Sequence, residues 1–273
     1  MHELTLSVLV GAAAGLAMAS LGAFKDTAYE GFSARAFARS IVIACLVAAL
    51  GWAISWPYGR TISPVGGFLA IIAIERLATE AYKSFIRTPP TGRRVPSQAA
   101  IFGKPVQGRG ARLALGALFT SFVVLLLVAI GQLRTVQPGA PYLAFGVLCG
   151  GLVAMGGAWK DAPIEGWSTL AFARSPLVGG LVGLVASNLP LGTAATSSMA
   201  AVTLFFVCLG GERITVESYK AFIRRRCPSK FYVPAAEQQG ISGRDRSPWH
   251  PDFARLAYVA CYAVALSIVA LIA

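Results

Sequence analysis

The chain has 273 residues, of which 56% are hydrophobic and 13% charged, and its mean hydropathy is +0.64. This composition is typical of a polytopic membrane protein and excludes an ordinary soluble globular domain. The net charge of +12 would suit a nucleic-acid-binding protein, but the positions of the basic residues argue against that class.

Eight apolar stretches follow one another along the chain, each near the ~20 residues that a helix needs to cross ~30 Å of hydrocarbon. They lie at about 4–23, 40–57, 61–82, 113–133, 142–158, 176–190, 193–212 and 254–272. We therefore expect an all-α, polytopic integral membrane protein with eight transmembrane helices.

The basic residues fall almost entirely on one side of these expected spans. If the spans alternate in direction, the segments 22–40, 75–112, 157–176 and 211–255 share a side and hold 22 of the 24 Lys and Arg residues. This positive-inside bias predicts a protein of the bacterial inner (cytoplasmic) membrane with both termini on the non-cytoplasmic side. The positive charge would then orient the protein in the membrane and contact anionic lipid headgroups. We therefore expect no nucleic-acid partner.

Two sequence blocks occur twice in the same order. Residues 22–40 and 157–175 are identical at 12 of 19 positions, and residues 75–87 and 212–224 are identical at 8 of 13 positions. Such self-similarity predicts a duplicated unit, with one four-helix repeat at 1–136 and another at 137–273. Because each unit holds four spans, both enter the membrane in the same direction, and a pseudo-two-fold axis should run along the membrane normal.

The first helix of each repeat carries a GxxxG pattern at matching positions. Gly11 and Gly15 correspond to Gly146 and Gly150. Small residues four apart let membrane helices approach closely, so we expect these two faces to meet at the pseudo-symmetry axis.

The first repeated block places charges at the cytoplasmic end of the first helix. Ser40 and Ser175 follow as expected N-caps of the second helix, with Pro176 at the first helical position. An arginine beside such a helix start, Arg39 or Arg174, suits a phosphate or a carboxylate.

The second block lies at the inner end of the third helix. Counting from the outer turn, Glu75 should lie within the inner leaflet, with Glu212 at a similar level. Arg76 and Glu80 are four residues apart, as are their counterparts in the second repeat, so each pair can meet on one helix face.

Two interpretations of these charges stay open: a salt-bridge network that neutralises itself, and a site for a ligand phosphate. For the second, the expected catalytic carboxylates are Asp26, Glu30, Glu75, Asp161, Glu165 and Glu212. The expected ligand-binding residues are Lys25, Arg39, Ser40, Lys83, Lys160, Arg174, Ser175 and Lys220. Glu80 and Glu217 are the expected ligands of a divalent cation such as Mg²⁺.

Three functions are compatible with this pattern. We rank first a membrane-embedded enzyme that acts on a phosphorylated lipid or a nucleotide-activated headgroup. The alternatives are a transporter or flippase of a small anion or lipid, which duplication favours, and a non-catalytic subunit or scaffold that docks a protein partner through the basic loops 88–112 and 225–253. No Walker, Rossmann, zinc or nucleophile-elbow signature occurs.

Overall fold

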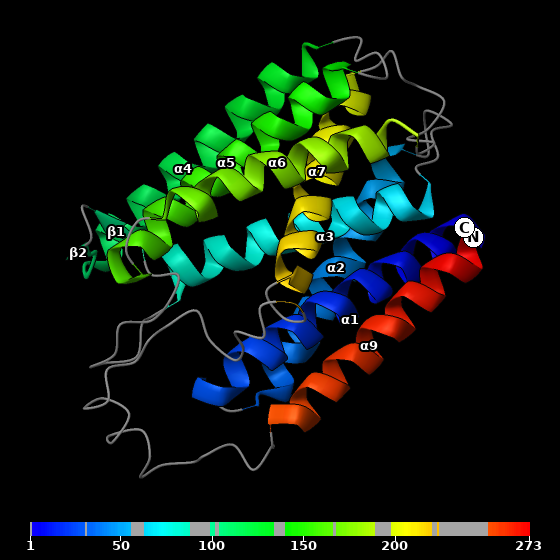
Figure 1. Cartoon of the computed structure of the whole chain (residues 1–273), viewed down its shortest axis with the longest axis horizontal. Coiled ribbons are helices and arrows are strands. Elements are labelled where there is room, and N and C mark those ends of the chain that lie inside the picture. The colour runs from blue at the N-terminus through cyan, green and yellow to red at the C-terminus, as the bar shows by residue number, and fades with distance from the viewer. Residues whose placement is uncertain are drawn as a thin grey trace.

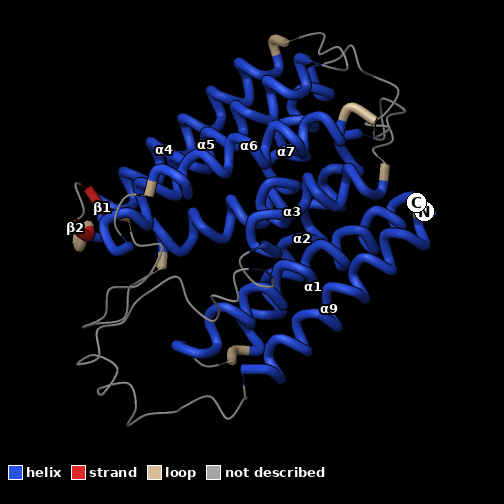
Figure 2. The backbone as a smooth tube through the Cα atoms, viewed as in Figure 1, coloured by secondary structure: helices blue, strands red, loops and turns tan. Residues whose placement is uncertain are grey.

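In the computed structural model, the described residues are 2–30, 32–55, 63–87, 99–101, 104–133, 140–165, 168–188, 198–219, 223 and 251–273. These residues form eight α-helices, one short π-helix and one hairpin with two strands of two residues each (Figures 1 and 2). The expected all-helical fold is therefore confirmed. The helices are α1 (His2–Glu30), α2 (Ala34–Ser55), α3 (Pro64–Ala81), α4 (Arg109–Gly131), α5 (Ala140–Glu165), α6 (Thr169–Ala186), α7 (Ser198–Ser218) and α9 (Pro251–Ile272).

Two short elements lie between α3 and α4. The last turns of α3 widen into the π-helix η2 (Tyr82–Ile86), and an antiparallel hairpin of β1 (Ala100–Ile101) and β2 (Lys104–Pro105) follows. α3 begins at Pro64, directly after Ser63, and the Ser63 hydroxyl accepts a hydrogen bond from the backbone N–H of Gly66 at 3.1 Å. This is a helix start of the usual kind, with a serine cap and proline in the first turn.

Within the described residues, four stretches are long and apolar enough to cross a membrane, by length and composition. They are His2–Phe24, Ala34–Ile54, Arg109–Gly131 and Pro141–Ala158, and α6 and α9 hold shorter apolar stretches. The outward sides of these helices are apolar, as at Leu118 and Leu125 of α4, each 68% exposed. Large exposed apolar faces of this kind suggest association with a membrane.

The helix boundaries differ from those expected at the repeated charged block. α1 continues to Glu30 and α5 to Glu165, about two turns beyond their apolar stretches, and α2 begins at Ala34 rather than at residue 40. Ser33 caps α2, because its hydroxyl accepts the backbone N–H of Ala36 at 3.2 Å. The predicted N-cap role of Ser40 and Ser175 is therefore wrong: both lie inside a helix, and Pro176 lies inside α6.

The glycines of both GxxxG patterns bring consecutive helices together. A Cβ on Gly15 would clash with Ile41 of α2, and one on Gly150 would clash with the backbone carbonyl of Ser175 in α6. Close packing through glycine is confirmed. The expectation that the two glycine faces meet each other is wrong, because their nearest neighbours belong to the next helix of the same half.

The centre of the molecule is the crossing of α3 and α7. At this crossing a Cβ on Gly210 of α7 would overlap the backbone carbonyl of Leu69 in α3, so only glycine permits the approach. The two buried apolar clusters lie on either side. One involves α1, α2, α3 and α9, and the other involves α3, α4, α5, α6 and α7.

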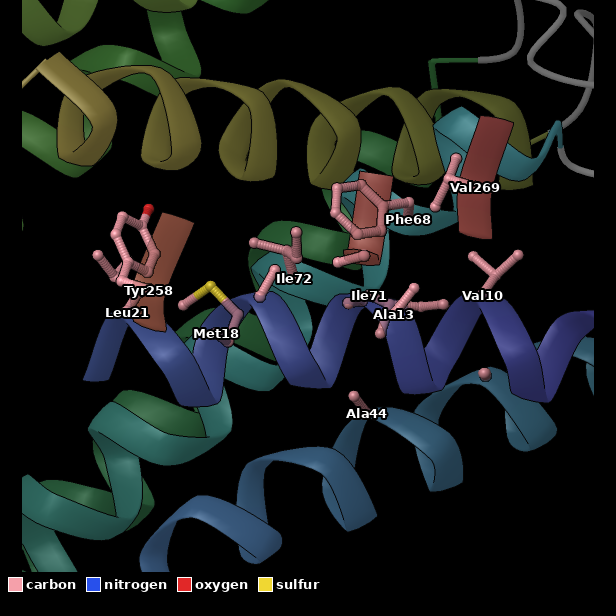
Figure 3. Close-up of a cluster of buried hydrophobic side chains, with 14 of the residues drawn as sticks. Val10, Ala13, Met18, Leu21, Ala44, Phe68, Ile71, Ile72, Tyr258 and Val269 are labelled. Atoms are coloured by element: carbon pink, nitrogen blue, oxygen red, sulfur yellow. The ribbon is translucent and has the colours of Figure 1, made fainter. Parts of the chain in front are cut away.

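Each apolar cluster is completed by a helix that lies in the other half of the sequence. α9 packs along α1, where Phe24 and Tyr258 stack with ring centroids 5.3 Å apart. Figure 3 shows Tyr258 and Val269 facing the row of α1 side chains that runs from Val10 to Leu21. On the opposite side, Ile130 of α4 joins the cluster built on α5 and α7. The last helix of each half therefore ties the two halves together.

Candidate functional site: two matching ionic clusters

The C-terminal parts of α3 and α7 carry two matching sets of side chains, most of them charged or polar. The first cluster consists of Arg39, Glu75, Arg76, Thr79, Glu80 and Tyr82. The second cluster consists of the corresponding Arg174, Glu212, Arg213, Val216, Glu217 and Tyr219. α3 contacts α2, and α7 contacts α6, so the arginine of the second helix in each half is brought beside the acidic helix.

Glu75 and Glu212 are buried carboxylates, each 1% exposed. Glu75 is the twelfth residue of α3 and Glu212 the fifteenth of α7, which puts them about 17 and about 21 Å from the helix starts. The hydroxyl of Thr79 donates to Glu75 Oε1 at 2.8 Å. Val216 stands at the matching position of α7 and, having no hydroxyl, offers Glu212 no such bond.

Both expected ion pairs are present. Arg76 Nη2 pairs with Glu80 Oε1, and Arg213 Nη1 pairs with Glu217 Oε1 at 2.9 Å. The side chains of the first pair are 24% and 21% exposed, whereas those of the second are 18% and 2% exposed. The four-residue spacing, read on a helix, predicted these contacts correctly.

The arginine of the first repeated block lies over a tyrosine ring in each half. The Cζ of Arg39 is 5.3 Å from the ring centroid of Tyr82, and that of Arg174 is 6.0 Å from Tyr219. Among the described residues no acceptor contacts the Nε of either arginine. A guanidinium in a cation–π contact with a ring can still donate to an anion from the N–H groups that do not face the ring.

Both tyrosines begin a π-helical turn. In the first half, the backbone N–H of Arg87 donates to the carbonyl of Tyr82 at 2.8 Å, five residues earlier. In the second half the backbone is π-helical at Tyr219 and at Ile223. π-turns are rare in proteins and occur often at functional sites.

The remaining candidate residues fall into two groups. Ser40 and Ser175 are buried, and the backbone carbonyl of each lies beside a glycine of the preceding helix, Gly15 and Gly150. Lys83 is half-buried within η2. Outside the described part of the structure lie Lys220 and the side chains of Lys25, Asp26, Glu30, Lys160, Asp161 and Glu165, so their predicted roles stay predictions.

The proposed metal site also stays a prediction. The described part of the chain contains no group of three or more His, Cys, Asp or Glu side chains that could hold a metal ion. Glu80 and Glu217, the expected ligands, each pair with an arginine of their own helix. A cation bound at these carboxylates would have to compete with that guanidinium.

Arg112 was missed by the sequence analysis. It lies in the first turn of α4, is 3% exposed, and its Nη1 donates to the backbone carbonyl of Arg87 at 2.6 Å. A signal was present, because the tetrapeptide Ala-Arg-Leu-Ala at 111–114 recurs at 254–257 near the start of α9. The side chain of Arg255 lies outside the described residues.

Each cluster combines a guanidinium over a tyrosine ring, a second arginine and a buried carboxylate. Such a set can bind a phosphate and place a carboxylate near it. Comparison of the chain with protein-family models, with curated proteins and with solved structures found no match. Function therefore has to be inferred from the geometry and charge of the clusters themselves.

Proposed function

We propose that the protein is an integral membrane enzyme that acts on a phosphorylated lipid or a nucleotide-activated headgroup at the cytoplasmic face of the bacterial inner membrane. It has eight spans, arranged as two like-oriented repeats at 1–136 and 137–273. The observation that carries the proposal is the stacking of Arg39 on Tyr82 and of Arg174 on Tyr219. The pair recurs at matching positions and leaves guanidinium N–H groups for a phosphate.

The depth of the charges supports a lipid as the ligand. Glu75 lies about 17 Å along α3, whereas ~30 Å of hydrocarbon has to be crossed, so it belongs to the inner leaflet if α3 starts at the outer surface. Tyr82 and Lys83 lie about two turns further, near the level of the headgroups. A lipid phosphate would thus contact Arg39, while its acyl chains contact the apolar faces of the helices.

The position of α9 supports an enzyme rather than a transporter whose halves rock against each other. α9 lies in the second half of the chain and packs along α1 of the first half. Rocking of one half against the other would have to break the stacking of Phe24 on Tyr258. A fixed site at one interface needs no such movement.

The ligand class can be tested with purified full-length protein in nanodiscs. The nanodiscs consist of phosphatidylcholine doped with either phosphatidic acid or diacylglycerol, which differ in the phosphate alone. We expect native mass spectrometry to retain phosphatidic acid preferentially, and Arg39→Lys to weaken retention, because a point charge does not replace a fork of N–H donors. Equal retention of both lipids would contradict the proposal.

The enzymatic part needs a separate measurement. The same nanodiscs, with phosphatidic acid or cytidine diphosphate diacylglycerol and Mg²⁺, are followed by ³¹P NMR. New phosphorus resonances that depend on the protein and disappear in Asp26→Asn are expected. If the protein retains phosphatidic acid but neither lipid gives a new resonance, the result contradicts the enzymatic part of the proposal. It would then support a lipid-binding subunit.

The topology can be tested with single cysteines. In a background without the five native cysteines, cysteine replaces either Ser63 before α3 or Gln107 before α4. In intact cells, a membrane-impermeant maleimide should label position 63 and leave position 107 unlabelled until the cells are opened. The reverse pattern would put the clusters on the outer face.

A further inference from the structure

The start of α2 carries two arginines where the start of α6 carries one. Arg35 and Arg39 lie four residues apart in α2, and this spacing places both on the same helix face. The matching positions of α6 are occupied by Leu170 and Arg174. Arg35 is exposed, and Leu170 is 79% exposed. Because both positions face outward, packing inside the protein does not explain why one half has a guanidinium there and the other half a leucine.

Arg35 lies one turn beyond the contact of Arg39 with the tyrosine ring. Arg39 is near the start of α2 and Tyr82 directly follows α3, so the start of α2 lies beside the end of α3. Four residues of helix separate Arg35 from Arg39 by about 6 Å along the axis. Arg35 is therefore the nearer of the two to the end of this helix pair and, in the proposed orientation, to the cytoplasm.

The charges of these two arginines are not used by ion pairs in the described part of the chain. Each ion pair found there joins two residues of one helix, α3 or α7, so neither Arg35 nor Arg39 has a carboxylate partner among the described side chains. The buried Nε of Arg39 also has no acceptor among them. The start of α2 therefore presents two positive charges to a ligand.

Two guanidinium groups one helical turn apart suit an anion with two linked phosphates. Arginine binds phosphate oxygens through paired N–H donors, and its long side chain lets each guanidinium reach one of the two phosphates. Exposed apolar residues continue the same face along α2, at Val42 with 56% and Leu46 with 58% exposed. Such a stripe offers an acyl chain a surface directly beside the arginines. The combination fits a diphosphate attached to an apolar chain.

We infer that the first half binds a membrane lipid with two linked phosphates: Arg39, over the Tyr82 ring, binds the phosphate nearer the acyl chains, and Arg35 binds the outer phosphate. The inference rests on the proposed function and narrows its ligand to lipid diphosphates. This class includes lipids whose headgroup is activated as a nucleoside diphosphate. The second half, with Leu170 in place of Arg35, offers one arginine at this position of its helix and so suits a single phosphate.

The test compares two lipids that differ by one phosphate. Full-length protein in phosphatidylcholine nanodiscs receives equal amounts of phosphatidic acid and diacylglycerol diphosphate with the same acyl chains, and native mass spectrometry measures which lipid is retained. The unchanged protein should bind the diphosphate about fivefold more tightly, as expected for one charge-assisted contact at an exposed position. Arg35→Leu should lower this preference to less than about twofold, whereas Arg35→Lys should keep part of it. Arg39→Gln should weaken the binding of both lipids, because both contain the inner phosphate.

Two controls separate this contact from charge alone and from a soluble ligand. Arg109 is also exposed and is the first residue of α4, so Arg109→Leu removes the same charge elsewhere and should leave the preference at about fivefold. Inorganic pyrophosphate supplies two linked phosphates without acyl chains, and we expect that it does not displace the lipid diphosphate. Displacement would assign a soluble diphosphate to the site and overturn the inference of a lipid.

Equal binding of the two lipids by the unchanged protein, or an undiminished preference in Arg35→Leu, would overturn the inference. Arg35→Gln, which keeps a polar side chain, covers the case in which Arg35→Leu does not fold, and it should lower the preference in the same way. If the unchanged protein does not distinguish phosphatidic acid from diacylglycerol, the proposed function fails. The ratio of diphosphate to phosphatidic acid binding still decides whether Arg35 binds a second phosphate.

Discussion

The ion pair Arg76–Glu80 of the first cluster keeps about a quarter of each side chain exposed, with 24% and 21%, whereas in Arg213–Glu217 the glutamate is 2% exposed. The same motif on the same kind of helix is therefore open in one half and closed in the other. Arg39 also lies closer to its tyrosine ring than Arg174 does, at 5.3 against 6.0 Å. The first cluster is therefore the more accessible of the two, and the proposed ligand would reach it more readily than the second.

The glycine contacts differ in the same direction. In α5 and α6, glycines of both helices face each other, and a Cβ on Gly146 would overlap the carbonyl of Gly179. In α1 and α2, a Cβ on the matching Gly11 would lie 2.7 Å from the Cβ of Ala48 and 2.8 Å from a carbonyl. The α5–α6 pair therefore packs more closely at its glycines than the α1–α2 pair does.

The largest expected effect concerns these glycines. Gly146→Ala should lower the free energy of unfolding by about 3 kcal/mol, and Gly11→Ala by about 1 kcal/mol, because the overlap with the neighbouring helix is smaller at Gly11. Thermal unfolding in detergent measures both. Gly151→Ala is the control, since nothing lies within 4 Å of its Cβ position. Equal losses of unfolding free energy in Gly146→Ala and Gly11→Ala would contradict the inferred difference in packing.

The second prediction compares the two glutamates. Glu217→Gln should destabilise the protein by about 2 kcal/mol, because it leaves a buried guanidinium without its charged partner. Glu80→Gln, in a partly exposed pair, should cost less than about 1 kcal/mol. Urea unfolding in mild detergent gives both values. A larger loss of unfolding free energy in Glu80→Gln than in Glu217→Gln would contradict this prediction.

The third prediction concerns the ligand. Arg39→Lys should weaken phosphatidic acid binding about tenfold, and Arg174→Lys no more than about twofold, since a lysine loses the bidentate geometry only where a ligand uses it. Titration of the lipid into nanodiscs, followed by native mass spectrometry, measures both affinities. A larger loss at Arg174 would assign the ligand to the second half.

The smallest effect is expected at the one position where the clusters differ by a hydroxyl. Thr79→Val should cost about 1 kcal/mol, because it removes the hydrogen bond to the buried Glu75. Val216→Thr supplies the matching hydroxyl beside Glu212 and should leave stability unchanged or raise it slightly. If both substitutions destabilise the protein equally, packing rather than the hydroxyl determines the outcome.

Hydrophobicity predicted the helices well and their ends poorly. The eight apolar stretches correspond to the eight helices, because length and hydropathy are properties of a single segment. The ends of α1 and α5 were placed too early, because hydropathy marks where an apolar stretch ends and not where a helix ends. For the same reason α2 was expected to begin at Ser40 rather than after Ser33.

The sequence pattern predicted contacts within one helix but not contacts between helices. The spacing of Arg76 and Glu80 predicted their ion pair, since both residues lie on one helix. The contact of Arg39 with the Tyr82 ring joins two different helices, and no pattern within one helix predicts how two helices are rotated against each other. Likewise, nothing in the repeat indicates that α9 packs on α1.

The contact between α9 and α1 has a consequence for how the protein is made. The face of α1 that carries Val10, Leu21 and Phe24 is covered by Tyr258 and Val269, which are synthesised more than two hundred residues later. At ~5–20 residues per second, the ribosome needs on the order of tens of seconds to supply that cover. During this interval the apolar face of α1 lacks its final partner. Biogenesis of the first half thus ends only when the last helix arrives.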